Sequence, residues 1–143
     1  MKQILLVDDE VHIGQQIMHF LNQRGYSVVY VQDGAEAIRL LDTAWDEYAL
    51  VCCDLMMPSI GGLEVLQHLR QNLAMRCLPV VILSYPVAGD NLEEMRTNNG
   101  FAGYVNADLN IAIVTKQDFS LKERPLLLHD IWLAIQSLLE LNL

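Results

Sequence analysis

The stretch Ala49-Leu50-Val51-Cys52-Cys53-Asp54-Leu55-Met56-Met57-Pro58 joins an apolar run to a single carboxylate and then to a turn. A short apolar run of this kind is typical of a strand buried on both faces of a sheet. Pro58 and Gly61-Gly62 end the strand, and a helical spacing of apolar residues begins at Leu63. We therefore expect Asp54 at the carboxyl end of a core strand, where α/β sheets bind ligands. There it is either a solvated loop carboxylate or a reactive one.

The composition predicts one packed domain over residues 1–143, since 52% of the residues are hydrophobic. Nine basic and eighteen acidic residues give a formal net charge of −9, which argues against direct binding to nucleic acid or to an anionic membrane. The three cysteines form no paired framework, so buried free thiols are expected. No segment approaches the ~18 apolar residues of a membrane span. We expect a soluble, cytoplasmic protein.

Strand-like and helical segments alternate along the chain, with strands expected near residues 4–7, 26–31, 49–54, 79–83 and 103–105. This alternation predicts a parallel sheet covered by helices on both faces. Right-handed crossovers then place the carboxyl end of every strand at one edge. The polar residues that follow these strands should converge at that edge and form a functional pocket: Asp8, Asp9, Asp54 and Ser84.

Three carboxylates at one edge repel each other and disfavour ionisation unless a cation joins them. Mg²⁺ fits such a site because it takes oxygen ligands, uses one or two carboxylates and keeps several waters. Bound there, it would neutralise a phosphoryl group that arrives at the remaining carboxylate. Asp54 would then be a nucleophile that forms an acyl phosphate, with a neighbouring hydroxyl bonded to one phosphoryl oxygen.

With these residues, the chain resembles the receiver domains of bacterial two-component response regulators, the CheY-like family. The resemblance covers roughly residues 2–105 and implies a doubly wound, five-stranded parallel sheet of flavodoxin-like order 2-1-3-4-5. It rests on the order and spacing of Ile4-Leu5-Leu6-Val7-Asp8-Asp9-Glu10, Asp54-Leu55-Met56-Met57-Pro58 with Gly61-Gly62, Ser84, and Gly100-Phe101-Ala102-Gly103-Tyr104-Val105.

The resemblance also implies what each residue does. Asp54 would accept a phosphoryl group from the phosphohistidine of a histidine kinase or a phosphotransfer protein. Ser84 would be the switch hydroxyl and Tyr104 the rotating aromatic of a two-state equilibrium. The domain would thus be a switch and not an enzyme with turnover. Mg²⁺ would be held by the side chains of Asp8, Asp9 and Asp54 and the backbone carbonyl of Met56.

The family's lysine, three residues beyond the aromatic, is replaced here by Ala107. In a first alignment, which we favour, residues 103–105 are the fifth strand and residues 111–116 are an added antiparallel edge strand. Lys116 would then lie far from the phosphate. In a second alignment, residues 111–116 are the fifth strand and Lys116 is the phosphate-pairing lysine, which requires extra residues upstream and a non-aromatic residue at the switch position.

The first alignment divides the chain into a family-like core over about residues 2–107, an atypical segment over 108–124 and a C-terminal helix over about 125–141. Apolar residues outside the packing face of that helix predict a homodimer contact or a link to an output domain. Tyr85 follows Ser84 at a position where the family usually has a small residue, so altered switching is expected.

Two other functions stay open. A degenerate receiver would keep the fold and act through protein contacts without phosphorylation. The missing lysine and Tyr85 favour it, while the intact acids oppose it. A phosphatase of the haloacid dehalogenase type also forms an aspartyl phosphate, but it needs a second acid two residues after the nucleophile, where Met56 stands.

Overall fold

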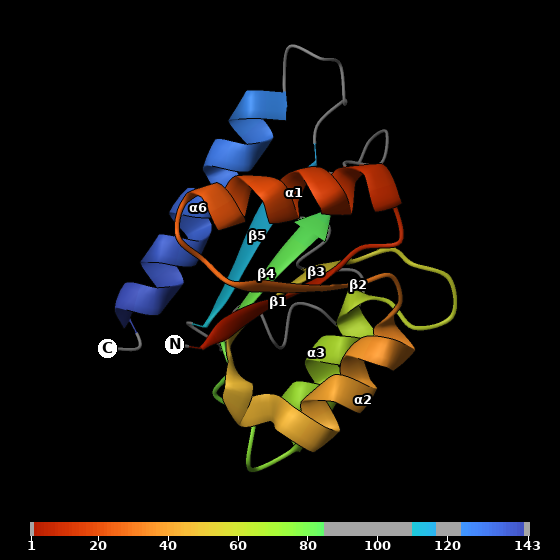
Figure 1. Ribbon diagram of the computed structural model, residues 1–143. Helices are drawn as coiled ribbons and strands as arrows, with labels where there is room; N and C mark the ends of the chain where they lie inside the picture. Colours follow the sequence, from red (N-terminus) through yellow and green to blue (C-terminus); the bar gives the residue numbers. More distant parts are fainter. Residues whose placement is uncertain (1, 85–109, 117–123, 142–143) are drawn as a thin grey trace.

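The computed structural model describes residues 2–84, 110–116 and 124–141. Five parallel strands form one sheet between two layers of helices (Figure 1). The predicted strand order is confirmed, since the strands lie in the order β2-β1-β3-β4-β5. Their bounds are β1 Gln3–Val7, β2 Val28–Val31, β3 Tyr48–Asp54, β4 Val80–Ser84 and β5 Ile111–Thr115.

Within the described residues, two pairs of helices cover the two faces of the sheet (Figure 1). The helices are α1 Val11–Gln23, α2 Gly34–Ala44, α3 Gly62–Gln71 and α6 Arg124–Leu141, with a short 3-10 turn, η1, at Trp45–Glu47. Apolar side chains of α1 and α6 pack on one face, and those of α2 and α3 pack on the other. Among the described residues, no helix combines the length and apolar character needed to cross a bilayer.

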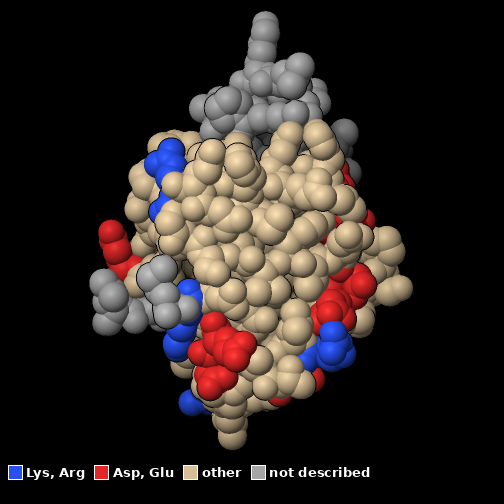
Figure 2. Space-filling model, viewed as in Figure 1, with Lys and Arg blue, Asp and Glu red and all other residues tan. Residues whose placement is uncertain are grey.

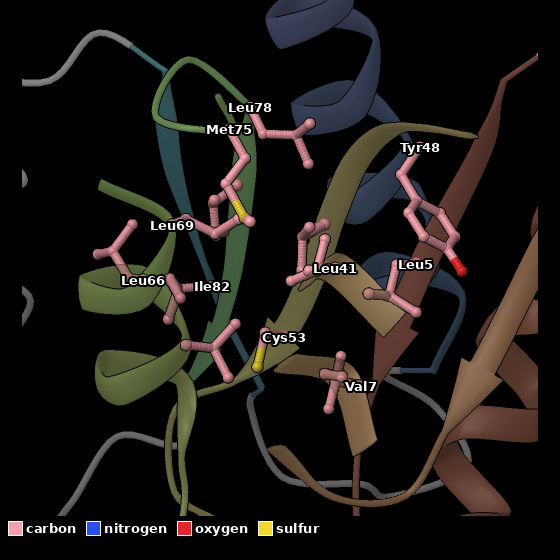
Figure 3. Close-up of a cluster of buried hydrophobic side chains, with 14 residues drawn as sticks. Leu5, Val7, Leu41, Tyr48, Cys53, Leu66, Leu69, Met75, Leu78 and Ile82 are labelled. Atoms are coloured by element: carbon pink, nitrogen blue, oxygen red, sulfur yellow. The ribbon is translucent and has the colours of Figure 1, made fainter. Parts of the chain in front are cut away.

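Successive residues of the central strands enter opposite cores, as the two-residue period of a strand requires. Leu5 and Val7 belong to the core under α2 and α3, while Ile4 and Leu6 belong to the core under α1 and α6. Figure 3 shows the first of these cores. Both faces of the sheet are therefore buried, which is why these strands read as continuous apolar runs in the sequence.

The cysteines of β3 follow the same alternation. Cys53 lies in the core under α2 and α3, and Cys52 in the core under α1 and α6. Both are free and buried as predicted, whereas Cys77 is free but exposed. Burial raises the pKa of the Cys52 and Cys53 thiols, so they stay protonated.

The fifth strand corrects the sequence prediction. Residues 111–115 are β5 itself, and they pair parallel to β4 in a register that sets Ile82 beside Ile113 and Ser84 beside Thr115. The favoured alignment, with an added antiparallel edge strand, was wrong. A parallel neighbour needs a crossover of a dozen or more residues, and the chain between β4 and β5 is long enough to supply one. Residues 103–105 and Ala107 lie outside the described part of the chain.

Local interactions set two of the described helix ends. The Asp33 carboxylate accepts the Glu36 backbone N–H at 2.7 Å and caps α2. Gly25 has a φ of 91°, the left-handed conformation that follows a helix end. Helix α1 contains no Lys, Arg, Asp or Glu, and Figure 2 shows a broad face with few charged residues on this side of the molecule.

Helices α1 and α6 are also joined by Arg24. Its guanidinium lies 4.9 Å from the centre of the Phe20 ring and 4.5 Å from that of Trp132 on α6. A cation over an aromatic face is attracted by the ring quadrupole. The contact therefore joins α6 to the carboxyl end of α1.

Candidate functional site

Four polar side chains meet at the carboxyl edge of the sheet, and each is buried. Asp54 and Ser84 are the last residues of β3 and β4, while Asp8 and Lys116 directly follow β1 and β5. Their residues are 1%, 2%, 0% and 0% exposed, respectively. Parallel pairing sets them side by side, with Val7 opposite Cys53 and Ser84 opposite Thr115. The predicted convergence of Asp8, Asp54 and Ser84 is thus seen in the fold.

Lys116 lies at the centre of this group. Its Nζ donates to Asp8 Oδ2 at 2.6 Å and lies 3.2 Å from Asp54 Oδ2 and 3.5 Å from Glu10 Oε1. Its backbone N–H donates to the Ser84 carbonyl at 2.7 Å, which extends the β4–β5 ladder. The expectation that this lysine lies far from Asp54 was therefore wrong. The β-branched run that ends directly before Lys116 is the sequence feature that could have indicated its position.

The acids that the structure groups together differ from those expected. Asp8, Glu10 and Asp54 each present an oxygen within 4.8 Å of the others. Asp9 is exposed and lies outside this group of described residues. Glu10 turns toward the pocket because its backbone N–H donates to Asp8 Oδ1 at 2.9 Å, which closes a tight turn ahead of α1. Sequence reasoning missed Glu10, although it is the third acid of the same run.

Asp54 is held by the turn that follows it. The Met56 backbone N–H lies 3.4 Å from Asp54 Oδ1, while the Met56 side chain points outward and its residue is 72% exposed. Gly62 allows the chain to fold back closely, because a Cβ there would lie 2.8 Å from the Asp54 carbonyl oxygen. The Met56 carbonyl as a metal ligand stays a prediction, and Tyr85 and Tyr104 lie outside the described residues.

Burial controls the charge of this group. Burial is the largest cause that raises the pKa of Asp54, which reaches about 7 after Lys116 lowers it and the neighbouring Asp8 raises it. Burial likewise raises the pKa of Asp8, again against the effect of Lys116. For Lys116, burial lowers the pKa, but the two carboxylates outweigh it and the net direction is upward. The Lys116 ammonium thus lies near all three carboxylates of this group.

The donor set fits a divalent cation of the Mg²⁺ type. Each carboxylate offers oxygen ligands, which such hard cations prefer. Burial, as the largest cause, raises the pKa of Asp8 and Asp54, because it disfavours the charged carboxylates. A divalent ion bound beside them would favour the ionised forms, and the partly exposed Glu10, whose side chain is 40% exposed, leaves the group open to solvent.

The comparison with known families agrees with this geometry. The model of the response regulator receiver domain matches residues 4–116. The chain belongs to the response regulator receiver domains. The matched segment ends at Lys116, so it includes β5 and the lysine that follows it.

Curated relatives share this part of their length with the chain. Response regulator RppA of Synechocystis sp. is 39% identical over 82 residues, which cover 57% of this chain and 34% of the relative. Response regulator RR06 of Streptococcus pneumoniae is 31% identical over 130 residues, which cover 90% of this chain and 57% of the relative. The chain therefore spans between about a third and somewhat over half of the length of these two relatives.

Solved structures share the receiver fold. A response regulator receiver domain protein from Clostridium thermocellum superposes with a TM-score of 0.73 at 19% identity, covering 99% of this chain and 97% of that one. A chemotaxis protein from Vibrio cholerae gives a TM-score of 0.68 at 22% identity, covering 94% and 98%. These similarities confirm the flavodoxin-like architecture that the sheet order indicates.

Proposed function

We propose that this receiver domain is a phosphoacceptor of a two-component system, in which Asp54 takes a phosphoryl group from the phosphohistidine of a histidine kinase or a phosphotransfer protein. The observation that carries the proposal is the position of Lys116, whose ammonium lies between the buried carboxylates of Asp8 and Asp54. A cation fixed there pairs with carboxylates before transfer. After transfer it is within reach of the new phosphoryl oxygens.

In the transfer itself, an ionised Asp54 oxygen attacks phosphorus, an O–P bond forms, and the P–N bond to the donor histidine breaks. The electron pair of that bond returns to the imidazole. Because burial raises the pKa of Asp54 to about 7, the nucleophile is only partly ionised near neutral pH when no other cation is bound. Extra positive charge at the site would lower that pKa and increase the ionised fraction.

Mg²⁺ is the proposed cofactor, and it would neutralise the charge that develops on the phosphoryl oxygens. The side chains of Asp8, Asp54 and Glu10 are grouped to hold it. Asp9 and the Met56 carbonyl, both implied by the resemblance to receiver domains, remain proposed ligands. The Ser84 hydroxyl would bond a phosphoryl oxygen and act as the switch, a role supported by its burial at the end of the neighbouring strand.

The modification would act as a signal and not as a step of steady turnover. Replacing the single charge of an ionised Asp54 by the two charges of an acyl phosphate would change the partners of Lys116, and that is the type of local event that biases a two-state element. A homodimer contact through α6 stays a prediction. Among the described residues of that helix, Leu133 is the large apolar residue that is exposed, at 47%.

Two features favoured the degenerate receiver, the missing lysine and Tyr85. Lys116 lies in the pocket and argues against the first, while Tyr85 lies outside the described residues. The phosphatase needs an acid at the position of Met56, whose side chain points away from the pocket.

The proposal is tested by incubating the protein with acetyl phosphate and Mg²⁺ and measuring the mass of the intact chain. We expect a phosphoryl adduct on the wild type and none on Asp54→Asn. Asp46→Asn is the matched control, because Asp46 is an exposed aspartate in η1, and it should be labelled like the wild type. Equal labelling of Asp54→Asn, or no labelling of the wild type in the presence of Mg²⁺, would refute the proposal.

A further inference from the structure

Tyr30 links the edge strand β2 to the acidic turn that follows β1. Its hydroxyl donates to the backbone carbonyl of Asp8 at 2.7 Å. Tyr30 lies opposite Leu6 in the parallel ladder, two residues before Asp8 along β1. The side chain therefore reaches past the end of β1 and contacts the first peptide group of the turn. The hydrogen bond is formed by a residue that lies 22 positions away in the sequence.

The first turns of α1 are shaped to receive this ring. A Cβ on Gly14 would lie 2.4 to 2.6 Å from the outer atoms of the Tyr30 ring, closer than any real side chain allows. Gly14 itself is buried and begins the hydrogen bonding of α1 by donating to the Glu10 carbonyl at 2.9 Å. The glycine thus allows the ring to pass close to the helix, and the helix in turn limits where the hydroxyl can lie.

The carbonyl that Tyr30 holds belongs to the peptide unit between Asp8 and Asp9. The other groups of Asp8 are bound as well: its backbone N–H donates to the Val31 carbonyl at 3.2 Å, and its two carboxylate oxygens accept from the Glu10 N–H and the Lys116 Nζ. With the carbonyl fixed, the peptide plane has one orientation. That orientation decides the direction in which the next two acids leave the strand.

We propose that Tyr30 is a positioning residue for the cation site: by holding the Asp8 carbonyl, it orients the turn that carries Asp8, Asp9 and Glu10. The inference rests on the proposed function, because it concerns the same Mg²⁺ site. Tyr30 itself contributes no ligand. Its effect is to place the carboxylates before the cation arrives, so that binding does not have to order the turn.

The test compares Mg²⁺ binding to the wild type and to Tyr30→Phe, measured by calorimetric titration of the folded chain. Phenylalanine keeps the ring over Gly14 and removes only the hydroxyl. We expect a Mg²⁺ dissociation constant that is about three- to ten-fold higher, the range that one net hydrogen bond contributes. The rate of labelling by acetyl phosphate should return to within about twofold of the wild type at saturating Mg²⁺, since Asp54 and Lys116 are untouched.

Tyr48→Phe is the matched control. Tyr48 is a buried tyrosine at the start of β3, in the core under α2 and α3, so its hydroxyl lies at the opposite edge of the sheet. A merely structural role of Tyr30 would lower the melting temperature, as this control also can, without moving the Mg²⁺ dependence. An unchanged Mg²⁺ dissociation constant for a folded Tyr30→Phe would overturn the inference.

Gly14→Ala disturbs the contact between the Tyr30 ring and α1 from the side of the helix. It keeps the inference testable if Tyr30→Phe folds poorly. The added methyl must displace the ring, so we expect a similar loss of Mg²⁺ affinity. The double variant should bind no more weakly than Gly14→Ala alone, because both changes remove one hydrogen bond. Full additivity would overturn the inference. If the wild type bound no Mg²⁺, the proposed function would fail. If the wild type and both variants bound Mg²⁺ with equal affinity, only the role of Tyr30 would be refuted.

Discussion

The two ends of β3 meet opposite environments, although the strand is buried along nearly its whole length. At its amino end, Tyr48 and Leu50 lie among apolar side chains. Beside Tyr48, an open apolar hollow of about 450 Å³ is lined mainly by Trp45, Met75, Leu78 and their neighbours. At its carboxyl end, Asp54 is just as buried but lies beside a second carboxylate and an ammonium.

The two ends of the strand therefore have different roles, one in stability and one in chemistry. Apolar burial at the amino end stabilises the fold because it removes surface from water. Buried charge at the carboxyl end is costly to desolvate, and it persists only where partners offset that cost. The domain therefore tolerates the cost of buried charge at the carboxyl edge because the remainder of the sheet is well packed. The chemistry is confined to that edge.

The largest expected loss of stability comes from removing the Lys116 ammonium from the charged edge of the sheet. Lys116→Met keeps the length of the side chain but removes the ammonium from Asp8 and Asp54. We expect the free energy of unfolding at pH 8, without Mg²⁺, to fall by about 3–5 kcal/mol, the usual result of breaking a buried ion pair. Urea denaturation measures it. At pH 5 the loss should be smaller, since protonated carboxyls need no counter-charge.

Lys2→Met is the control for that substitution, because Lys2 is exposed at the other end of the sheet. Its free energy of unfolding should change by less than about 0.5 kcal/mol. If Lys116→Met were as stable as the wild type at pH 8, the buried carboxylates would not depend on this lysine.

A change at the apolar end should cost nearly as much but behave differently with pH. Leu50 is fully buried in the core under α1 and α6. We expect Leu50→Ala to lower the free energy of unfolding by about 2–5 kcal/mol through lost burial and a cavity. The loss should be the same at pH 5 and pH 8, because no titrating group is removed. Leu73→Ala, at an 80% exposed site, is the matched control with little effect.

The smallest expected effect is the pH dependence of stability that the charged end of β3 causes and the apolar end does not. Burial raises the pKa of Asp54 from 3.8 to about 7, so the folded state holds this proton more tightly than the unfolded state does. The resulting stability is fully present below about pH 4 and is lost as the pH rises toward 7. Without Mg²⁺, we expect the free energy of unfolding to fall by about 1 kcal/mol per pH unit between pH 5 and 7.

Asp54→Asn should flatten much of that slope, since the amide does not titrate, and Asp8 would account for what remains. Mg²⁺ should also flatten it in the wild type by favouring the ionised carboxylates. Denaturation curves at several pH values, with and without Mg²⁺, give both results. A wild-type stability that rises with pH over this interval would contradict the raised pKa.

Much of the site was predictable because its residues follow strong local signals. Asp54 ends an unmistakable apolar run, and Asp8 and Ser84 follow two others. Parallel topology then brings them together without any knowledge of side-chain contacts. The sequence did not indicate which of Asp9 and Glu10 faces the pocket. They are neighbours in the sequence, and only the turn closed by Asp8 Oδ1 decides which of them faces the pocket.

The fifth strand and its lysine could not be assigned in the same way. Counting residues from Tyr104 led to Ala107, because that alignment assumed the usual distance between the fourth and fifth strands. Loop lengths vary more than strand pairings do. The pairing of β4 with β5 depends on hydrogen bonds such as that from the Lys116 N–H to the Ser84 carbonyl. Such bonds join residues too distant in the chain for any local pattern to indicate.

By itself, the sequence determined the alternation of strands and helices from β1 to β4 and the edge at which the acids gather. Hydrophobic periodicity and turn residues are local properties, and the handedness of crossovers is general. Only the tertiary structure decided that residues 111–115 complete the sheet, that Lys116 enters the pocket, and that Tyr30 holds the Asp8 carbonyl. Each of these depends on strand pairing and close packing between distant segments, which exist only once the chain has folded.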